Sequence, residues 1–244
     1  MSTLSFAEML RSASTPESAE VDSGLAMVPL PHTTAWDPAY YAQEQISALV
    51  RRVFFPGWPQ PSKQVVFTAV DASHDIASIC RRVGETLASQ VPGTICMVDA
   101  DARSARLGAA YESFRPASSY ILAGQSLKDR ATRIFNNLWL LPASVFAPDP
   151  EKDVSIAWLR HRLSDLRREF DYSIVHAPAV TAFSETGLLA HFADGVVLVL
   201  HAHRTRRLAA QHARDVLQST SARLIGAVLD QKPFPIPASV YRRL

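Results

Sequence analysis

Cysteine is scarce in this sequence, since Cys80 and Cys96 are the only two among its 244 residues. Each falls in an apolar stretch, as reduced core cysteines commonly do, so disulfides are not expected to stabilise the fold. Long apolar runs are also absent: nothing approaches the roughly 18 residues of a membrane-crossing helix. The opening stretch, MSTLSFAEML, lacks the basic and apolar blocks of a signal peptide. These absences predict a cytoplasmic protein, which a membrane-bound partner can still recruit to the inner membrane.

An excess of either charge is missing as well, because 25 Lys and Arg stand against 23 Asp and Glu, for a formal net charge of +2. A chain whose charges are so nearly balanced gives no electrostatic argument for nucleic acid binding, and nucleic acid is not expected as a partner. The hydrophobic content of 48% is enough to bury one sizeable core. Residues 1–40, rich in Ser, Pro, Ala and Glu, are expected to be a flexible tail or linker before a single domain at 41–244.

Apolar strands alternate with amphipathic helices through the rest of the chain. Apolar runs predict strands at 65–70, 94–98, 138–141, 172–175, 195–200 and 224–229. Apolar residues three and four apart predict helices at 38–55, 76–88, 153–169 and 205–219. This alternation favours a three-layer α/β fold, in which right-handed crossovers place helices on both faces of a mostly parallel central sheet.

The stretch from Lys63 to Ala88 is a strand, loop and helix unit of the kind that opens the sheet of nucleotide-binding α/β proteins. In those proteins the loop holds phosphates on backbone N–H groups and a lysine. Here Ser73 is expected to cap the helix and Asp75 to lie in its first turn. The loop contains neither glycine nor lysine, so the scaffold is present without its usual phosphate-binding groups.

Two carboxylates, Asp99 and Asp101, follow the second strand at its carboxyl end, where open parallel sheets bind their ligands. They are candidates for an inherited active site, or for hydrogen bonds that cap the following turn. His176 ends the fourth strand, where a lone histidine is more often hydrogen-bonded than catalytic. His201 and His203 are expected to point to one side of a strand, but no third metal ligand is evident by spacing.

Several motifs occur in an order that is characteristic of one family: MVDADAR at 97–103, FDYSIVHAPAV at 170–180, ADGVVLVLHAHRTR at 193–206 and ARLIGAVLDQ at 222–231. With them the chain resembles, over roughly residues 45–244, the bacterial tyrosine kinases of capsule and exopolysaccharide synthesis. These are MinD/ParA-type P-loop ATPases. The resemblance implies a P-loop NTPase-like fold, and a family whose active members use ATP and Mg²⁺.

The resemblance also implies which residues stand at the family's functional positions. The glycines, lysine and hydroxyl of its phosphate loop fall between Ser73 and Ser78, where Ser78 keeps a hydroxyl suited to Mg²⁺. Its Asp-x-Asp-x-Arg motif is present as Asp99, Asp101 and Arg103. In the family these aspartates serve metal binding and catalysis, so Asp101 would share a Mg²⁺ with Ser78.

Other family positions are changed. Ile76 stands in the phosphate loop, where an apolar side chain has no phosphate role, and His176 replaces the Asp of the third motif. Ser73 and Asp230 fall at nucleotide-binding positions, with Asp230 in place of an Asn near the base. Family C-termini often hold several phosphorylated tyrosines, and here Tyr241 is the single candidate for phosphorylation.

Loss of the lysine and of at least one N–H contact removes about 4 kcal/mol, at roughly 1.5–3 kcal/mol for each charge-assisted hydrogen bond. That is about a thousandfold in affinity, so no cofactor is expected to bind tightly. The hypothesis that follows is a pseudokinase-like protein with a degenerate Walker A motif. It would regulate or scaffold polysaccharide export by binding the cytoplasmic tail of a co-polymerase-type membrane protein or an active kinase paralogue, and a homo-oligomer is left open.

The alternative hypothesis is an active ATPase or protein-tyrosine autokinase with an atypical phosphate loop. It would use ATP and Mg²⁺ through Ser78, Asp99 and Asp101. The missing cation would then come from Arg81, from Arg103 or from a neighbouring molecule.

Overall fold

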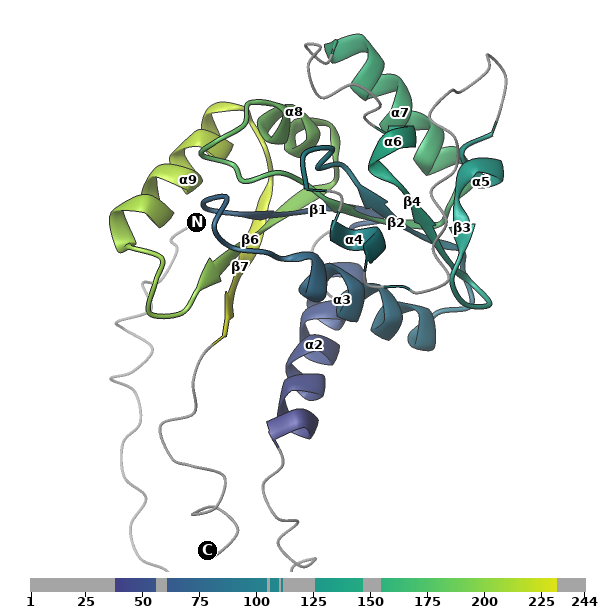
Figure 1. Cartoon of the computed structure of the whole chain (residues 1–244), viewed down its shortest axis with the longest axis horizontal. Coiled ribbons are helices and arrows are strands. Elements are labelled where there is room, and N and C mark those ends of the chain that lie inside the picture. The colour runs from purple at the N-terminus through teal and green to yellow at the C-terminus, as the bar shows by residue number, and fades with distance from the viewer. Residues whose placement is uncertain are drawn as a thin grey trace, which may run out of the picture. The chain divides into compact units, whose positions relative to one another are not determined.

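A single sheet organises the chain in a computed structural model, which describes residues 38–55, 61–104, 106–109, 111, 126–146 and 155–231. Within these ranges seven strands lie in the order β3-β4-β2-β5-β1-β6-β7, all parallel except β3, which is antiparallel to β4 (Figure 1). The strands are β1 (Gln64–Ala69), β2 (Ile95–Asp99), β3 (Thr132–Arg133), β4 (Leu138–Leu141), β5 (Tyr172–His176), β6 (Gly195–His201) and β7 (Leu224–Asp230). The helices are α2 (Pro38–Phe54), α3 (Ala77–Gln90), α4 (Arg106–Ala109), α5 (Leu127–Arg130), α6 (Ala143–Phe146), α7 (Ile156–Glu169), α8 (Glu185–Phe192) and α9 (Arg207–Ser219).

Helices cover both faces of the sheet. One apolar core lies between the sheet and α2 and α3, and a second lies between the opposite face and α7, α8 and α9 (Figure 1). Strand β1 lies between β5 and β6, and all six of its residues are buried. A strand covered on both faces needs a continuous apolar run rather than alternation. The expected three-layer α/β fold is confirmed.

The expected elements are found within one to three residues of their predicted bounds, and β4 covers 138–141 as predicted. Strand β3 and helices α4, α6 and α8 were not predicted. The two residues of β3 are too short to show alternation, and α8 carries Leu188, Leu189 and Ala190 in succession rather than on a stripe. Short elements without periodicity leave little signal in a sequence.

Two local expectations are wrong. Helix α3 begins at Ala77 with Ile76 as its N-cap residue, so Ser73 does not cap it and Asp75 precedes its first turn. The N–H of Ser73 instead donates to Oδ1 of Asp71, two residues earlier, at 3.0 Å. Side-chain bonds of this kind favour turns over helix, which delays the start of α3.

The paired histidines also differ from expectation. Strand β6 ends at His201, and His203 lies in the following turn with φ of 62°. The two imidazoles therefore do not alternate on one strand. Tyr241 and residues 1–37 of the expected tail lie outside the described residues. No helix in the described part of the chain has the length and apolar character that crossing a membrane requires.

Candidate functional site

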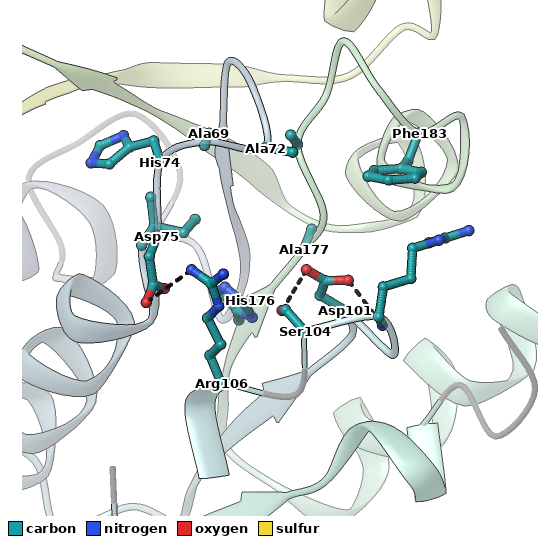
Figure 2. A pocket seen from close by; sticks show the side chains of 13 residues that line it. Ala69, Ala72, His74, Asp75, Asp101, Ser104, Arg106, His176, Ala177 and Phe183 are labelled. Carbon is teal, nitrogen blue, oxygen red and sulfur yellow. Dashed lines mark hydrogen bonds and ion pairs between the residues drawn. The ribbon is translucent and has the colours of Figure 1, made fainter. Parts of the chain in front are cut away.

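A small cavity of about 150 Å³ opens at the carboxyl ends of β1, β2 and β5. Residues from the β1–α3 loop, from the turn after β2 and from the end of β5 line it, and these include Asp75, Ile76, Asp101, Arg106 and His176 (Figure 2). Ligands of open parallel sheets bind at this edge, where strand order reverses around the first strand. The cavity is thus the candidate site that the fold provides.

In the loop between β1 and α3, a side chain of the loop itself binds the N-terminus of the helix that follows. Asp75 Oδ1 accepts a hydrogen bond from the backbone N–H of Ala77 at 3.0 Å, at the N-terminus of α3. Ile76 is only 2% exposed and packs in the core beneath. A helix N-terminus attracts anions because its first N–H groups are unpaired. Here a carboxylate of the chain itself takes one of those N–H groups.

Arg106, from α4, meets the same carboxylate. Its Nη1 lies 3.4 Å from Asp75 Oδ2, and Figure 2 shows the two side chains pointing toward each other across the cavity. Both groups are about half exposed, so the pair contributes little to stability. In the site, the Asp75 carboxylate offsets the positive charge of Arg106. Arg106 therefore attracts an anionic ligand less strongly than an unpaired arginine would.

His74, one of the residues that line the cavity, anchors the loop to the neighbouring strands. Its Nε2 lies 3.0 Å from Asp230 Oδ2 at the end of β7, and its ring stacks on His201 with centroids 4.8 Å apart. The His74 side chain is 3% exposed, and Figure 2 shows it turned away from the other lining residues. The loop is therefore held to β6 and β7, and Asp230 is already engaged by this contact.

Asp99 and His176 form a buried pair beneath the cavity. His176 Nδ1 lies 3.0 Å from Asp99 Oδ1, and the Asp99 side chain is 2% exposed. Asp99 Oδ1 also accepts from the N–H of Asp101 at 3.3 Å, and Oδ2 accepts from the N–H of Leu107 at 3.2 Å. Both oxygens of Asp99 are thus engaged within the protein, with partners in the turn after β2, in α4 and at the end of β5.

Asp101 shapes the rim of the cavity. Its Oδ1 accepts from the N–H of Arg103 at 3.2 Å, and its Oδ2 accepts from Ser104 Oγ at 2.6 Å. Arg103 reaches across to Glu185 at 2.9 Å and lies over the Phe183 ring at 4.1 Å. Burial alone would raise the pKa of Glu185, but the hydrogen bond and charge of Arg103 lower it below its ordinary value. Arg103 is therefore committed to α8 and its preceding turn.

The predicted site residues are only partly brought together. Asp99 and Asp101 are adjacent, whereas Ser78 is exposed on α3 and is not among the residues that line the cavity. Ser73 is exposed in the loop, outside the same lining. In the part of the chain that the structure describes, no group of three or more His, Cys, Asp or Glu side chains is arranged to hold a metal ion.

Sequence reasoning missed His74 and the capping role of Asp75. His74 gave no spacing signal, because its partner Asp230 is 156 residues away. Asp75 did offer a signal, since an Asp two residues before a helix commonly bonds to the helix N-terminus. That signal was assigned to a position inside the helix instead.

Known proteins resemble this chain in sequence and in fold, although no protein-family model matches it. It is 22% identical over 200 residues to tyrosine-protein kinase YwqD of Bacillus subtilis (strain 168), covering 80% of this chain and 84% of that protein. The crystal structure of the chimerical protein CapA2B2 superposes with a TM-score of 0.67 at 17% identity, over 78% of this chain and 85% of that one. The MinD cell division protein of Aquifex aeolicus superposes with a TM-score of 0.55 at 16% identity, over 75% and 73%.

These similarities extend over most of the chain. The solved structures are too distant in sequence to indicate more than the fold, which is that of the MinD/ParA-type P-loop ATPases. The similarity to bacterial tyrosine kinases comes from the sequence itself. The resemblance inferred from the motifs is confirmed.

Proposed function

Because this chain is related in sequence to the bacterial tyrosine kinases and has the fold of the MinD/ParA-type ATPases, we propose that it is a catalytically degenerate relative. Its role is to regulate or scaffold the synthesis or export of a capsule or exopolysaccharide. It does so by binding another protein, not by phosphoryl transfer. The partner is the cytoplasmic tail of a co-polymerase-type membrane protein or an active kinase paralogue.

One observation carries the proposal: the hydrogen bond from the Ala77 N–H to Asp75 Oδ1 at the N-terminus of α3. A phosphate group would need that N–H and would have to approach the Asp75 carboxylate. Repulsion between two anions that share one helix end opposes this approach. In place of a lysine the loop presents the buried, apolar Ile76.

The cations around the cavity do not replace that lysine. Arg103 is paired with Glu185 and Arg106 with Asp75. The cavity is about 150 Å³, below the roughly 300–1,000 Å³ of typical small-molecule pockets. The residues present therefore do not fit a nucleoside triphosphate in the pose that a phosphate loop provides.

The alternative, an active ATPase or autokinase, requires Ser78, Asp99 and Asp101 to meet around Mg²⁺. Asp99 has both carboxylate oxygens engaged within the protein, and Ser78 lies away from the cavity lining. These contacts favour the degenerate relative over the active enzyme.

Calorimetric titration with ATP, with and without Mg²⁺, tests the proposal. We expect no binding heat for the unmodified chain at millimolar nucleotide. The variant Asp75→Gly/Ile76→Lys removes the internal anion and restores an ammonium, and should gain Mg²⁺-dependent binding. Asp75→Gly/Ile76→Met is the matched control, because methionine has a similar length and no charge. Micromolar binding by the unmodified chain would overturn the proposal and favour the alternative.

The partner is tested separately. A synthetic peptide of the cytoplasmic tail of the co-polymerase-type protein from the same organism is titrated against the full chain, with a scrambled peptide as control. Saturable binding of the native peptide alone is expected. Absence of binding to this tail and to the active paralogue at millimolar concentration would contradict the scaffolding role while leaving the nucleotide result intact.

A further inference from the structure

Strand β7 forms one edge of the sheet. No other strand within the described ranges pairs with its outer side. Residues 224–229, LIGAVL, contain neither a charge nor a proline, and Leu229 is 55% exposed. Natural sheets usually protect an open edge with charges, prolines or a covering element, because an uncharged edge pairs readily with another strand. The composition of β7 therefore indicates a strand that is covered by a partner.

A bulge in β7 determines which of its residues share a face. Leu224 is in register with Val196 and Gly226 with Val197, so β7 has one extra residue, Ile225, at this step. Successive residues of a strand alternate between faces, and a bulge resets that alternation. Counted in this way, the face that carries α2 and α3 receives Arg223, Gly226, Val228 and Asp230, and the opposite face receives Leu224, Ala227 and Leu229.

We propose that β7 pairs antiparallel with β7 of a second copy of this chain, about a two-fold axis through Ala227. The axis is perpendicular to the sheet, so each residue must lie opposite one that shares its face. The bulge satisfies this condition along the strand. The opposed pairs are Ala227 with Ala227, Gly226 with Val228, Leu224 with Leu229 and Arg223 with Asp230.

These pairs are complementary in size. Among the residues that the structure describes, no heavy atom lies within 4 Å of the position that a Cβ on Gly226 would occupy. Val228 of the second copy therefore has room over Gly226. At the axis, the small Ala227 side chains allow two backbones to approach to hydrogen-bonding distance. Leu224 and Leu229 then cover each other, which removes the exposed Leu229 side chain from water.

The pairs are also complementary in charge. Arg223 lies just before β7 and Asp230 ends it, so an antiparallel partner places opposite charges together at both ends. Asp230 already accepts from His74 through Oδ2. A carboxylate accepts on both oxygens, so this contact is compatible with a second one.

An apolar groove of about 430 Å³ runs beside β7 on the α2 face. It is lined by Leu49, Arg52 and Val53 of α2 and by Ile225 and Val228 of β7, among others. In the paired arrangement the sheet continues past this groove into the second copy, and the strand of the second copy extends the apolar floor of the groove.

Pairing through β7 does not depend on whether a nucleotide binds. A test of the pairing therefore gives a result that is independent of the proposed function.

Sedimentation of the full chain over a range of concentrations tests the pairing, together with Ala227→Glu and Ala227→Lys. We expect a concentration-dependent dimer for the unmodified chain. Each variant alone places like charges against each other at the axis and should raise the dimer dissociation constant by roughly tenfold or more. An equimolar mixture of the two should restore the dimer, because only a residue that lies opposite itself gives this pattern. Circular dichroism confirms that both variants fold.

Hydrogen exchange of residues 224–230 at low and high concentration provides the second measurement. Protection that rises with concentration is expected. A monomer with freely exchanging β7 amides would mean an uncovered edge, and a monomer with protected amides would mean coverage by another segment of the same chain; either overturns the proposal. A dimer that neither Ala227 variant weakens would place the contact on a different surface, and also overturns it.

Discussion

His74 Nε2 lies 3.0 Å from Asp230 Oδ2, although the two residues are 156 positions apart. The contact joins the loop after β1 to the last residue of β7, and it buries the His74 ring against His201. The loop that would hold phosphates in a P-loop ATPase is therefore fastened to the edge of the sheet. The same contact links the candidate site to the strand that we propose as an interface.

Removal of this link should loosen the loop. His74→Ala removes the hydrogen-bond partner of Asp230, whose side chain is 24% exposed, at an expected cost of about 0.5–1.5 kcal/mol in the free energy of unfolding. Urea titration measures the loss, and hydrogen exchange at residues 71–76 should become faster. Asp230→Asn is the matched control, since its amide still offers a hydrogen-bonding oxygen, and its effect should be smaller. Unchanged exchange in His74→Ala would show that the loop is held by other contacts.

The Asp99 carboxylate is expected to be structural. Asp99→Ala leaves the N–H groups of Leu107 and Asp101 and the ring of His176 without their acceptor, so the free energy of unfolding should fall by about 3 kcal/mol or more. Asp99→Asn keeps one oxygen and the shape, and should cost less.

A double-mutant cycle with His176→Ala isolates the buried pair of Asp99 and His176. A coupling energy of about 0.5–3 kcal/mol is the usual range for residues in contact. Additive effects of Asp99→Ala and His176→Ala on urea unfolding would show that the two side chains act independently.

Stability should depend on pH through Asp171. Hydrogen bonds from the N–H of Thr94, at 2.8 Å, and from its hydroxyl, at 2.9 Å, lower the pKa of Asp171 below its ordinary value of 3.8. Because the folded pKa is below the unfolded one, the stabilisation is present above about pH 4 and is lost as the pH falls through the folded pKa. The difference in urea midpoint between the unmodified chain and Asp171→Asn should therefore shrink on acidification. Asp215→Asn, at an exposed carboxyl on α9, shows the effect of removing a charge alone.

Both cysteines should be inert while the protein is folded. Burial raises the pKa of the Cys80 and Cys96 thiols, and the negative charges of Asp99 and Asp75 raise that of Cys80 further. The thiolate is the reactive form, so alkylation at pH 8 should be slower than in urea by about a hundredfold or more. Ser78→Cys, at an exposed position two residues before Cys80 on α3, should react rapidly in the folded state. Rapid loss of either native thiol would indicate that the core opens.

The fold could be predicted from the sequence because most of its strands are long enough for their pattern of apolar residues to indicate which faces are buried. The run GVVLVL of β6 is apolar without alternation, as a strand buried on both faces must be. The positions of Asp99 and Asp101 followed from the same logic, since both come directly after a buried strand. Neither inference needed a contact between distant parts of the chain.

The side-chain contacts that occupy the candidate site could not be predicted in the same way. The bonds of His74 to Asp230 and of His176 to Asp99 join residues far apart in sequence, and spacing carries no information about them. The bulge at Ile225 is equally hidden, because it is a property of how two strands align. The composition of β7 shows an unprotected strand, but only the register shows which of its residues face one another.

Asp75 gives the first turn of α3 an anion that cannot diffuse away. In a P-loop ATPase the phosphate at this position arrives and leaves with the nucleotide. A covalently attached carboxylate stays in place whether or not nucleotide is present. For a protein that acts by binding, the surface around this loop would then be the same at any nucleotide concentration. Its influence would follow from its own abundance and that of its partner.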